Sequence, residues 1–113
     1  MNLIVWQRAV ELSTDIYRLT AAYPKSEQFG LVNQMRRASV SIASNIAEGY
    51  GKRTRGEYLQ SLGHARGSKC ELQTQIVIAK SLGFGAENSY ERTEHLCADV
   101  SRLLIALMNK LER

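Results

Sequence analysis

Positively charged side chains gather in the middle of the chain, where they could bind phosphate groups. Residues 36–69 contain seven lysines and arginines against two glutamates, a net charge of +5, whereas the rest of the chain is close to neutral. Such a segment attracts anionic partners, nucleic acid above all; an ordinary solvated surface is the alternative interpretation. The residues that we predict to contact nucleic acid are Lys52, Arg53 and Arg55, aided by Arg36 and Arg66.

A second group of polar residues lies on two stretches that should be helical and face each other. Polar side chains on facing helices form hydrogen bonds and ion pairs that fix the register of the helices when every member is satisfied. A small-ligand site and a solvated surface are the alternatives. The predicted interhelical network consists of Arg37, Asn45 and Glu48 on one side and Ser68, Glu71, Thr74 and Gln75 on the other, with Arg37 paired to Glu48 or Glu71.

Residues for catalysis or metal binding do not occur in a recognisable pattern. Helix bundles bind two metals through Glu-x-x-His pairs, but neither His64 nor His95 has a glutamate three positions before it. No nucleophile lies near a base in sequence, and Gly49 and Gly51 do not form a phosphate-binding loop because no strand precedes them. We therefore predict that the protein is not an enzyme and needs no metal or other cofactor.

The cysteines and the hydropathy of the chain indicate the cellular compartment of the protein. Cys70 and Cys97 fit neither a zinc site nor a disulfide framework, so we expect buried, reduced thiols. The N-terminal stretch does not resemble a signal peptide, because charged residues interrupt each apolar run. No stretch approaches the roughly 20 apolar residues of a membrane span. These observations predict a cytoplasmic protein without a membrane partner.

Apolar residues recur at steps of three and four along most of the chain, which is typical of amphipathic helices. Four helices are predicted at about residues 3–22, 27–50, 55–82 and 89–112, and no stretch alternates like a strand. Short connections between helices of similar length favour an all-α, up-down-up-down four-helix bundle. A chain of 113 residues is expected to form a single domain.

Local signals set the predicted ends of the first two helices. Pro24 should stop the first helix, because proline disfavours helical geometry in the residue before it. Ser26 with Glu27 is a start signal for the second helix. Gly49 or Gly51 can adopt the left-handed conformation that commonly ends a helix, and the second helix is expected to end there.

The third helix also has clear end signals. Thr54 stands three residues before Glu57, the spacing of a capping box. Residues 82–85, Leu-Gly-Phe-Gly, should close the helix. Inside it, Gly63 and Gly67 form a face of small residues with two serines, which would let another helix approach closely.

The second predicted helix has an unusually broad apolar surface. On a helical wheel its apolar residues cover roughly 200°, about twice the stripe of a helix that is buried on one side. We therefore expect this helix to be covered twice, by its own bundle and by another subunit of a homo-oligomer. Arg36 points into this apolar arc, where an unpaired charge is costly, and its expected partner is an acidic group of a neighbouring subunit. The arc consists of Leu31, Val32, Met35, Ala38, Val40, Ile42, Ala43, Ile46 and Ala47.

Residues 34–49 read Gln-Met-Arg-Arg-Ala-Ser-Val-Ser-Ile-Ala-Ser-Asn-Ile-Ala-Glu-Gly. They resemble a bacterial four-helix-bundle family first noticed as reading frames within intervening sequences of large-subunit ribosomal RNA genes. The likeness covers almost the whole chain. Ala43 stands where many members have proline, and Arg66 and Lys69-Cys70 replace mostly small or apolar residues. Further matches are Trp6 with Ala9, Pro24-Lys25, Phe29-Gly30-Leu31, Glu57-Tyr58-Leu59, Gly67-Ser68, Glu71-Leu72 and Thr74-Gln75.

This resemblance implies a four-helix bundle that assembles as a ring of five, without established enzymatic activity. It also implies kinship with the accessory protein of diversity-generating retroelements, a basic pentamer that associates with a reverse transcriptase and with nucleic acid. Together with the charge pattern, this predicts a homo-oligomeric protein, a pentamer on the family likeness, that binds RNA or DNA without sequence specificity. The alternative is a scaffold whose ring binds another protein.

Overall fold

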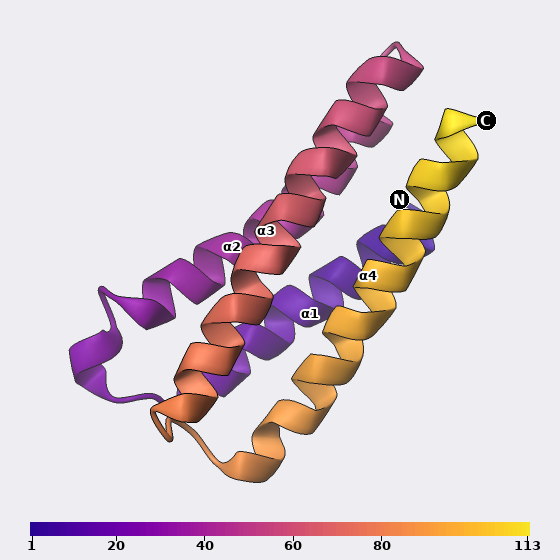
Figure 1. Cartoon of the computed structure of the whole chain (residues 1–113). Coiled ribbons are helices and arrows are strands. Elements are labelled where there is room, and N and C mark those ends of the chain that lie inside the picture. The colour runs from indigo at the N-terminus through magenta and orange to yellow at the C-terminus, as the bar shows by residue number, and fades with distance from the viewer.

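The computed structural model describes all 113 residues of the chain and contains helices only (Figure 1). This confirms the predicted all-α class and the four long helices. The elements in chain order are α1 (Ile4–Thr20), the 3-10 turn η1 (Lys25–Glu27), α2 (Leu31–Tyr50), α3 (Arg55–Ser81), the 3-10 turn η2 (Glu87–Ser89) and α4 (Tyr90–Glu112).

The four helices form an elongated bundle in which each helix runs antiparallel to the next (Figure 1). The bundle measures 44 × 24 × 22 Å. Helix α2 packs against α1 and α3, and α4 packs against α1 and α3, so that α1 lies diagonally across from α3. The contact between α2 and α3 is the most extensive, and that between α3 and α4 is the least. α2 and α3 are therefore the most closely packed pair of helices in the bundle.

The first connection is longer than the sequence predicted. Helix α1 ends at Thr20, two residues early, and the Thr20 hydroxyl donates a hydrogen bond of 2.7 Å to the Ile16 carbonyl. Helix α2 begins at Leu31 and not at residue 27. The reason is that the Glu27 side chain lies outside the helix, where its Oε1 accepts a hydrogen bond of 3.3 Å from the Leu31 amide. Glu27 thus caps the first turn of α2 and does not belong to it.

The α2–α3 connection corrects a second expectation. Neither Gly49 nor Gly51 is left-handed: α2 continues through Gly49 to Tyr50, and Gly51 follows it with φ −84°. Gly49 instead allows close packing, since a Cβ at this position would lie 2.9 Å from the Ser61 Cβ and 2.9 Å from the Tyr58 ring. Van der Waals contact with α3 therefore requires a glycine here.

The start and end of α3 follow the predicted signals. Thr54 Oγ1 accepts a hydrogen bond of 3.1 Å from the Glu57 amide, which satisfies a free donor of the first turn. At the other end Gly83 and Gly85 have φ values of +75° and +72°, a conformation that side chains with a Cβ rarely adopt. These two glycines turn the chain from α3 into η2.

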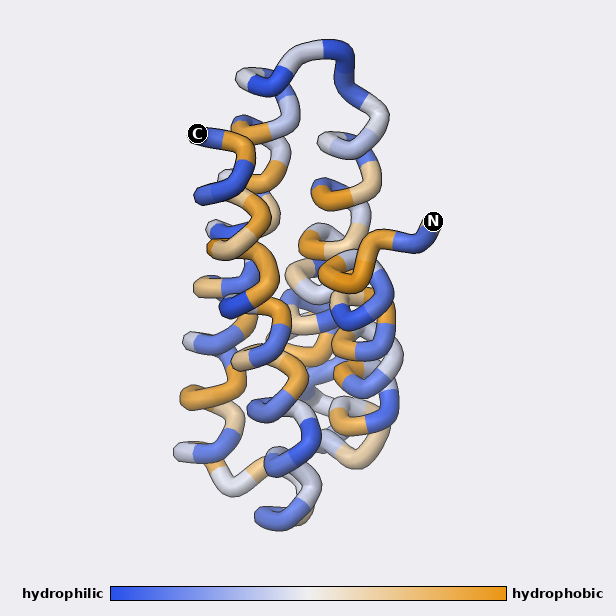
Figure 2. The backbone as a smooth tube through the Cα atoms, turned by 90° about the vertical axis from the view of Figure 1, so that its right-hand side faces the viewer, coloured by the Kyte–Doolittle hydropathy of each residue, from blue (hydrophilic) through white to orange (hydrophobic).

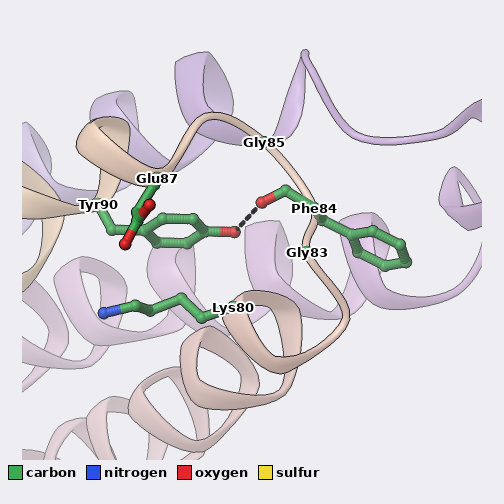
Figure 3. A pocket seen from close by; sticks show the side chains of 6 residues that line it. All are labelled: Lys80, Gly83, Phe84, Gly85, Glu87 and Tyr90. Atoms are coloured by element: carbon green, nitrogen blue, oxygen red, sulfur yellow. Dashed lines mark hydrogen bonds between the residues drawn. The ribbon is translucent and has the colours of Figure 1, made fainter.

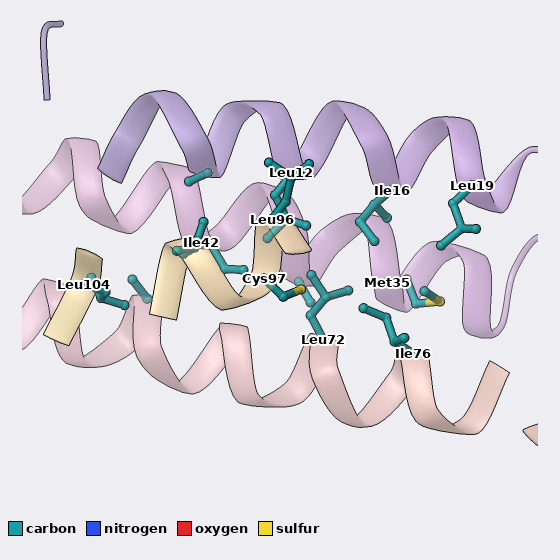
Figure 4. Packing of buried hydrophobic residues seen from close by; sticks show 14 of the residues in the cluster. Leu12, Ile16, Leu19, Met35, Ile42, Leu72, Ile76, Leu96, Cys97 and Leu104 are labelled. Carbon is teal, nitrogen blue, oxygen red and sulfur yellow. The ribbon is translucent and has the colours of Figure 1, made fainter. Parts of the chain in front are cut away.

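Twenty-one buried apolar residues from all four helices form one core (Figure 4). The apolar arc of α2 is mostly buried in this core, because α2 lies between two neighbouring helices. Five of its nine residues are buried, Leu31, Ala43 and Ala47 are half-buried, and Val40 is 43% exposed. The bundle itself therefore explains most of the arc, and only its outer edge is left for another molecule.

Figure 2 shows hydrophobic and hydrophilic residues interspersed along the helices. None of the helices combines the length and apolar character needed to cross a bilayer.

Candidate nucleic-acid interface

The α2–α3 connection and the C-terminal end of α4 lie together at one end of the bundle. The contact that joins them is a hydrogen bond of 3.1 Å from Arg55 Nη1 to a main-chain oxygen of Arg113. The C-terminal turn of α4 thereby adds Lys110 and Arg113, the second of which is 58 residues from Arg55 in sequence, so the charge pattern alone did not reveal them. We call the exposed cations at this end the basic tip: Lys52, Arg53, Arg55, Lys110 and Arg113.

One ion pair involves a cation of the basic tip, and the exposed Glu57 and Glu112 lie near it in sequence. Lys52 Nζ lies 3.5 Å from Glu48 Oε1, an exposed pair one helical turn apart. Arg53 has no ion pair with an aspartate or glutamate, and Arg55 donates to a main-chain oxygen of Arg113. The Glu57 carboxylate is engaged by the Thr54 hydroxyl at 2.9 Å. Exposed ion pairs contribute little energy, so a phosphate can displace Glu48 from Lys52.

Arg36 does not lie at the basic tip. It is sixteen residues before Lys52, about 24 Å along the helix axis, beside the C-terminal end of α1. Arg36 Nε donates to Thr20 Oγ1 at 2.9 Å, and Arg36 Nη2 donates to the Tyr17 carbonyl at 3.3 Å. Its guanidinium also stacks 4.6 Å from the centre of the Tyr17 ring.

The expectation that Arg36 needs an acidic partner from another subunit is therefore corrected. The carbonyls at the end of α1 carry partial negative charge and satisfy the cation within the chain. Sequence reasoning missed them because backbone groups do not appear as acidic residues.

The remaining cations of the central segment are also dispersed. Arg66 is exposed on α3, about 16 Å along the axis from Arg55. Lys69 is 8% exposed and faces α4, where its charge acts on Cys97. Cys97 is buried as predicted, and burial raises the pKa of its thiol to about 11, against the opposing effect of Lys69; Cys70 is exposed, which corrects the expectation that both thiols are buried. Five predicted phosphate contacts thus reduce to three that are close together.

Only a part of the predicted interhelical network is present, namely the contacts of Asn45 and Ser68. Ser68 Oγ lies 2.9 Å from Ser41 Oγ across the α2–α3 contact, and Asn45 Nδ2 donates to Ser41 Oγ at 3.0 Å and to the Ser41 carbonyl at 2.8 Å. Ser41, which was not part of the prediction, links the two helices because its position faces α3. This small network is a structural contact and not a binding site.

The charged members of the prediction do not join this network. Arg37 is exposed and has no ion pair, and Glu48 turns to Lys52. The facing side of α3 is occupied by Ser68, so no carboxylate comes within reach of Arg37. Gln75 is 6% exposed and donates only to Glu71 Oε1, at 3.4 Å on the same helix. Its Oε1 is buried without a partner.

A hollow of about 280 Å³ lies at the opposite end of the bundle, around the α3–α4 connection (Figure 3). Tyr90 Oη donates to the Phe84 carbonyl at 2.6 Å, so Tyr23 must be the donor in its 2.7 Å contact with Tyr90. Burial, followed by this donated hydrogen bond, raises the pKa of Tyr23. The chain of hydroxyls links the α1–α2 connection to the α3–α4 connection, and the charged side chains of Lys80 and Glu87 also line the hollow (Figure 3).

A buried polar contact locks α4 to α1. Asp15 is 8% exposed and accepts a hydrogen bond from the fully buried Thr93 hydroxyl, while Arg92 Nε lies 3.6 Å from its other oxygen. We expect Thr93→Val to lower the free energy of unfolding by about 2 kcal/mol, because a buried carboxylate then loses its donor. Urea titration at one protein concentration measures this, and Thr14→Val, at an exposed position, is the control. Equal stability of the two variants would contradict the prediction.

No three His, Cys, Asp or Glu side chains come together in an arrangement that could hold a metal ion. The exposed His95 lies with its Nε2 3.7 Å from the half-buried Asp99, one turn further along α4.

A model of the family described as 23S rRNA-intervening sequence protein matches residues 1–106. The fold is also similar to that of a protein of unknown function from the S23 ribosomal protein family of Bacteroides thetaiotaomicron, whose crystal structure is known. The two chains share 19% identity over 94% of this chain and 96% of the other, with a TM-score of 0.83. Neither description names an enzymatic activity. No curated protein matches this sequence.

Proposed function

Because this chain belongs to the family of 23S rRNA-intervening sequence proteins, we propose that it is a non-enzymatic homo-oligomer that binds nucleic acid without sequence specificity. The observation that supports binding most directly is the basic tip, where exposed cations lie on three chain segments and only one has a carboxylate partner. Phosphate contacts of this kind give affinity but carry no sequence information.

We set the number of subunits at five on the family resemblance. A ring would repeat the basic tip five times around one axis. Several weak phosphate sites on one particle bind a polyanion far more tightly than one site does, and binding becomes steeply dependent on salt. The exposed apolar residues on α1 and α2 support assembly, among them Val10 at 39% and Val40 at 43% exposure.

Neutralising the basic tip tests this proposal. We expect the triple variant Lys52→Gln, Arg53→Gln, Arg55→Gln to bind single-stranded RNA and duplex DNA about tenfold or more weakly at roughly 50 mM salt. The slope of log K against log salt should fall by about three, one for each cation removed. Fluorescence anisotropy across a salt series measures both quantities.

The matched control removes three other exposed cations that have no ion pair: Arg18→Gln, Lys25→Gln and Arg37→Gln. It changes the net charge equally but leaves the basic tip intact. Equal weakening in both variants would mean that net charge, and not the tip, attracts the ligand. Absence of binding by the wild-type protein near 50 mM salt would refute nucleic-acid binding outright.

A scaffold that binds another protein is the second candidate function, and the exposed apolar residues of α2 and α3 favour it. An apolar contact survives high salt, whereas phosphate contacts do not. Partner capture at high salt that persists in the triple variant would support the scaffold.

A further inference from the structure

One exposed aromatic side chain lies next to the cations of the basic tip. Tyr50 is the last residue of α2 and is 59% exposed. Lys52 and Arg53 follow it after a single glycine, and every residue from Gly51 to Glu57 is exposed. None of these seven residues is apolar apart from its glycines. The connection therefore contains no apolar side chain that could cover the Tyr50 ring.

The chain has two other exposed aromatic residues, and neither is placed in the same way. Tyr17 lies on α1, where the guanidinium of Arg36 already stacks 4.6 Å from the centre of its ring. Phe29 lies in the α1–α2 connection, at the opposite end of the bundle from the basic tip (Figure 1). Tyr50 is therefore the one exposed aromatic residue that lies beside the basic tip.

The ring of Tyr50 is held in place by α3. Its centre lies 6.4 Å from the centre of the Tyr58 ring, and the two rings are nearly perpendicular, at 89°. This edge-to-face arrangement is a preferred geometry of aromatic pairs. A ring that is already oriented loses less conformational freedom when a ligand binds than a freely rotating side chain does.

The cations of the basic tip lie within reach of this ring. Lys52 and Arg53 are two and three residues beyond Tyr50, and a chain of three residues spans at most about 10 Å. Arg55 stands three residues before Tyr58, about 5 Å along the axis of α3 and on the same face of that helix. A nucleotide carries its base one sugar away from its phosphate. A phosphate bound by one of these cations would therefore bring its base close to Tyr50.

We propose that the basic tip binds single-stranded nucleic acid, with an unpaired base stacked on Tyr50 and the adjoining phosphates bound by the cations of the tip. Every base has an aromatic face, so stacking adds affinity without sequence specificity. Bases inside a duplex are stacked on one another and reach a protein side chain only after they leave the stack. This inference rests on the proposed function and names the ligand class of the same site.

Three variants test the contact between the ring and a base. Tyr50→Leu removes the aromatic ring but keeps an apolar side chain next to Tyr58. Tyr50→Phe keeps the ring and removes only its hydroxyl group. The control, Tyr17→Leu, makes the same change at an exposed tyrosine on α1, away from the basic tip. Thermal unfolding followed by circular dichroism compares the stability of the variants with that of the wild type.

The ligands are three labelled oligonucleotides of equal length: single-stranded oligo(dT), the same chain without bases, and a DNA duplex. Fluorescence anisotropy at roughly 50 mM salt measures the affinities. We expect Tyr50→Leu to bind oligo(dT) about tenfold more weakly, because one base stack is lost. Tyr50→Phe and Tyr17→Leu should bind oligo(dT) like the wild type. The base-free chain and the duplex should bind equally well to the wild type and to Tyr50→Leu.

The salt dependence separates the ring from the cations. Stacking releases no counterions, so Tyr50→Leu should leave the slope of log K against log salt unchanged for oligo(dT). The triple variant of Lys52, Arg53 and Arg55 should lower this slope. A slope that falls equally in Tyr50→Leu would show that the substitution displaces the cations, and it would overturn the assignment of Tyr50 to a base.

A tryptophan in place of Tyr50 gives a direct spectroscopic signature. Trp6 is the single tryptophan of the chain and is half-buried on α1. Tyr50→Trp in a Trp6→Phe background therefore places the single indole at the basic tip. A base stacked on this indole quenches its fluorescence. We expect quenching by oligo(dT) and an unchanged emission with the base-free chain.

Other results also overturn the inference. Equal weakening of all three ligands by Tyr50→Leu, or no weakening of oligo(dT), would show that no base stacks on the ring. Equal affinity of the wild type for oligo(dT) and for the base-free chain would show the same. In these cases the proposed function stands if neutralising Lys52, Arg53 and Arg55 still weakens binding. Absence of wild-type binding to every ligand would remove the proposed function together with this inference.

Discussion

Replacing Leu72 with alanine is expected to lower the free energy of unfolding by about 3 kcal/mol, within the range measured for buried leucines. Leu72 lies on α3 in the centre of the core and is fully buried, close to Met35 of α2 and Cys97 of α4 (Figure 4). Removing its side chain loses apolar burial and leaves a cavity among three helices that cannot all move inward. For a domain of this size the midpoint of thermal unfolding should fall by about 15 °C.

The matched control is Leu82→Ala, which removes the same atoms from a position that is 58% exposed just after α3. Its effect should stay within about 0.5 kcal/mol. Both variants need to be compared at one protein concentration, because assembly adds to apparent stability. If Leu72→Ala were no more destabilising than Leu82→Ala in urea titrations, the core of Figure 4 would be wrongly packed.

Replacing Gly49 with leucine should be as damaging, at about 3 kcal/mol, for the opposite reason. The new Cβ would lie 2.9 Å from Ser61 Cβ, 2.9 Å from Tyr58 Cδ1 and 3.3 Å from the Tyr58 carbonyl oxygen. None of these atoms is the free end of a flexible side chain, so the α3 backbone must shift away from α2. The most extensive helix contact of the bundle would open at this end.

Gly56→Leu is the control for this prediction. Gly56 lies in the first turn of α3, where an added Cβ meets nothing within 4 Å. The same substitution should therefore be neutral or stabilise the helix by up to about 1 kcal/mol. Opposite effects of the two substitutions in thermal unfolding support the close contact. A Gly49→Leu variant as stable as wild type would show that α2 and α3 do not approach so closely.

The candidate site was predictable only as far as it is local in sequence. Lys52, Arg53 and Arg55 lie in one connection, so their proximity followed from spacing alone. Lys110 and Arg113 belong to the basic tip only in the folded protein, because the end of α4 lies next to the start of α3. Arg36 was predicted to act together with the cations of the connection, but its position along α2 places it beside the end of α1.

Contacts between helices were the least predictable feature. The polar strip of α2 indicated a network, but pairing depends on which α3 side chain stands opposite each position, and Ser68 stands opposite Ser41. Glycine commonly ends helices, so the sequence suggested that role for Gly49. The structure shows that Gly49 instead allows close packing, which becomes visible only when Tyr58 and Ser61 are placed beside it.

The sequence by itself determined the helical class, the four helices and most of their ends, because hydrophobic period, caps and glycine turns act within a few residues. It also determined the family, since the motif at residues 34–49 is contiguous. Only the tertiary structure decided which cations gather, which part of the broad arc of α2 stays uncovered, and that Gly63 and Gly67 of α3 face solvent. These features depend on the rotation and offset of helices relative to one another, which are set by packing across the whole bundle and not by any single segment.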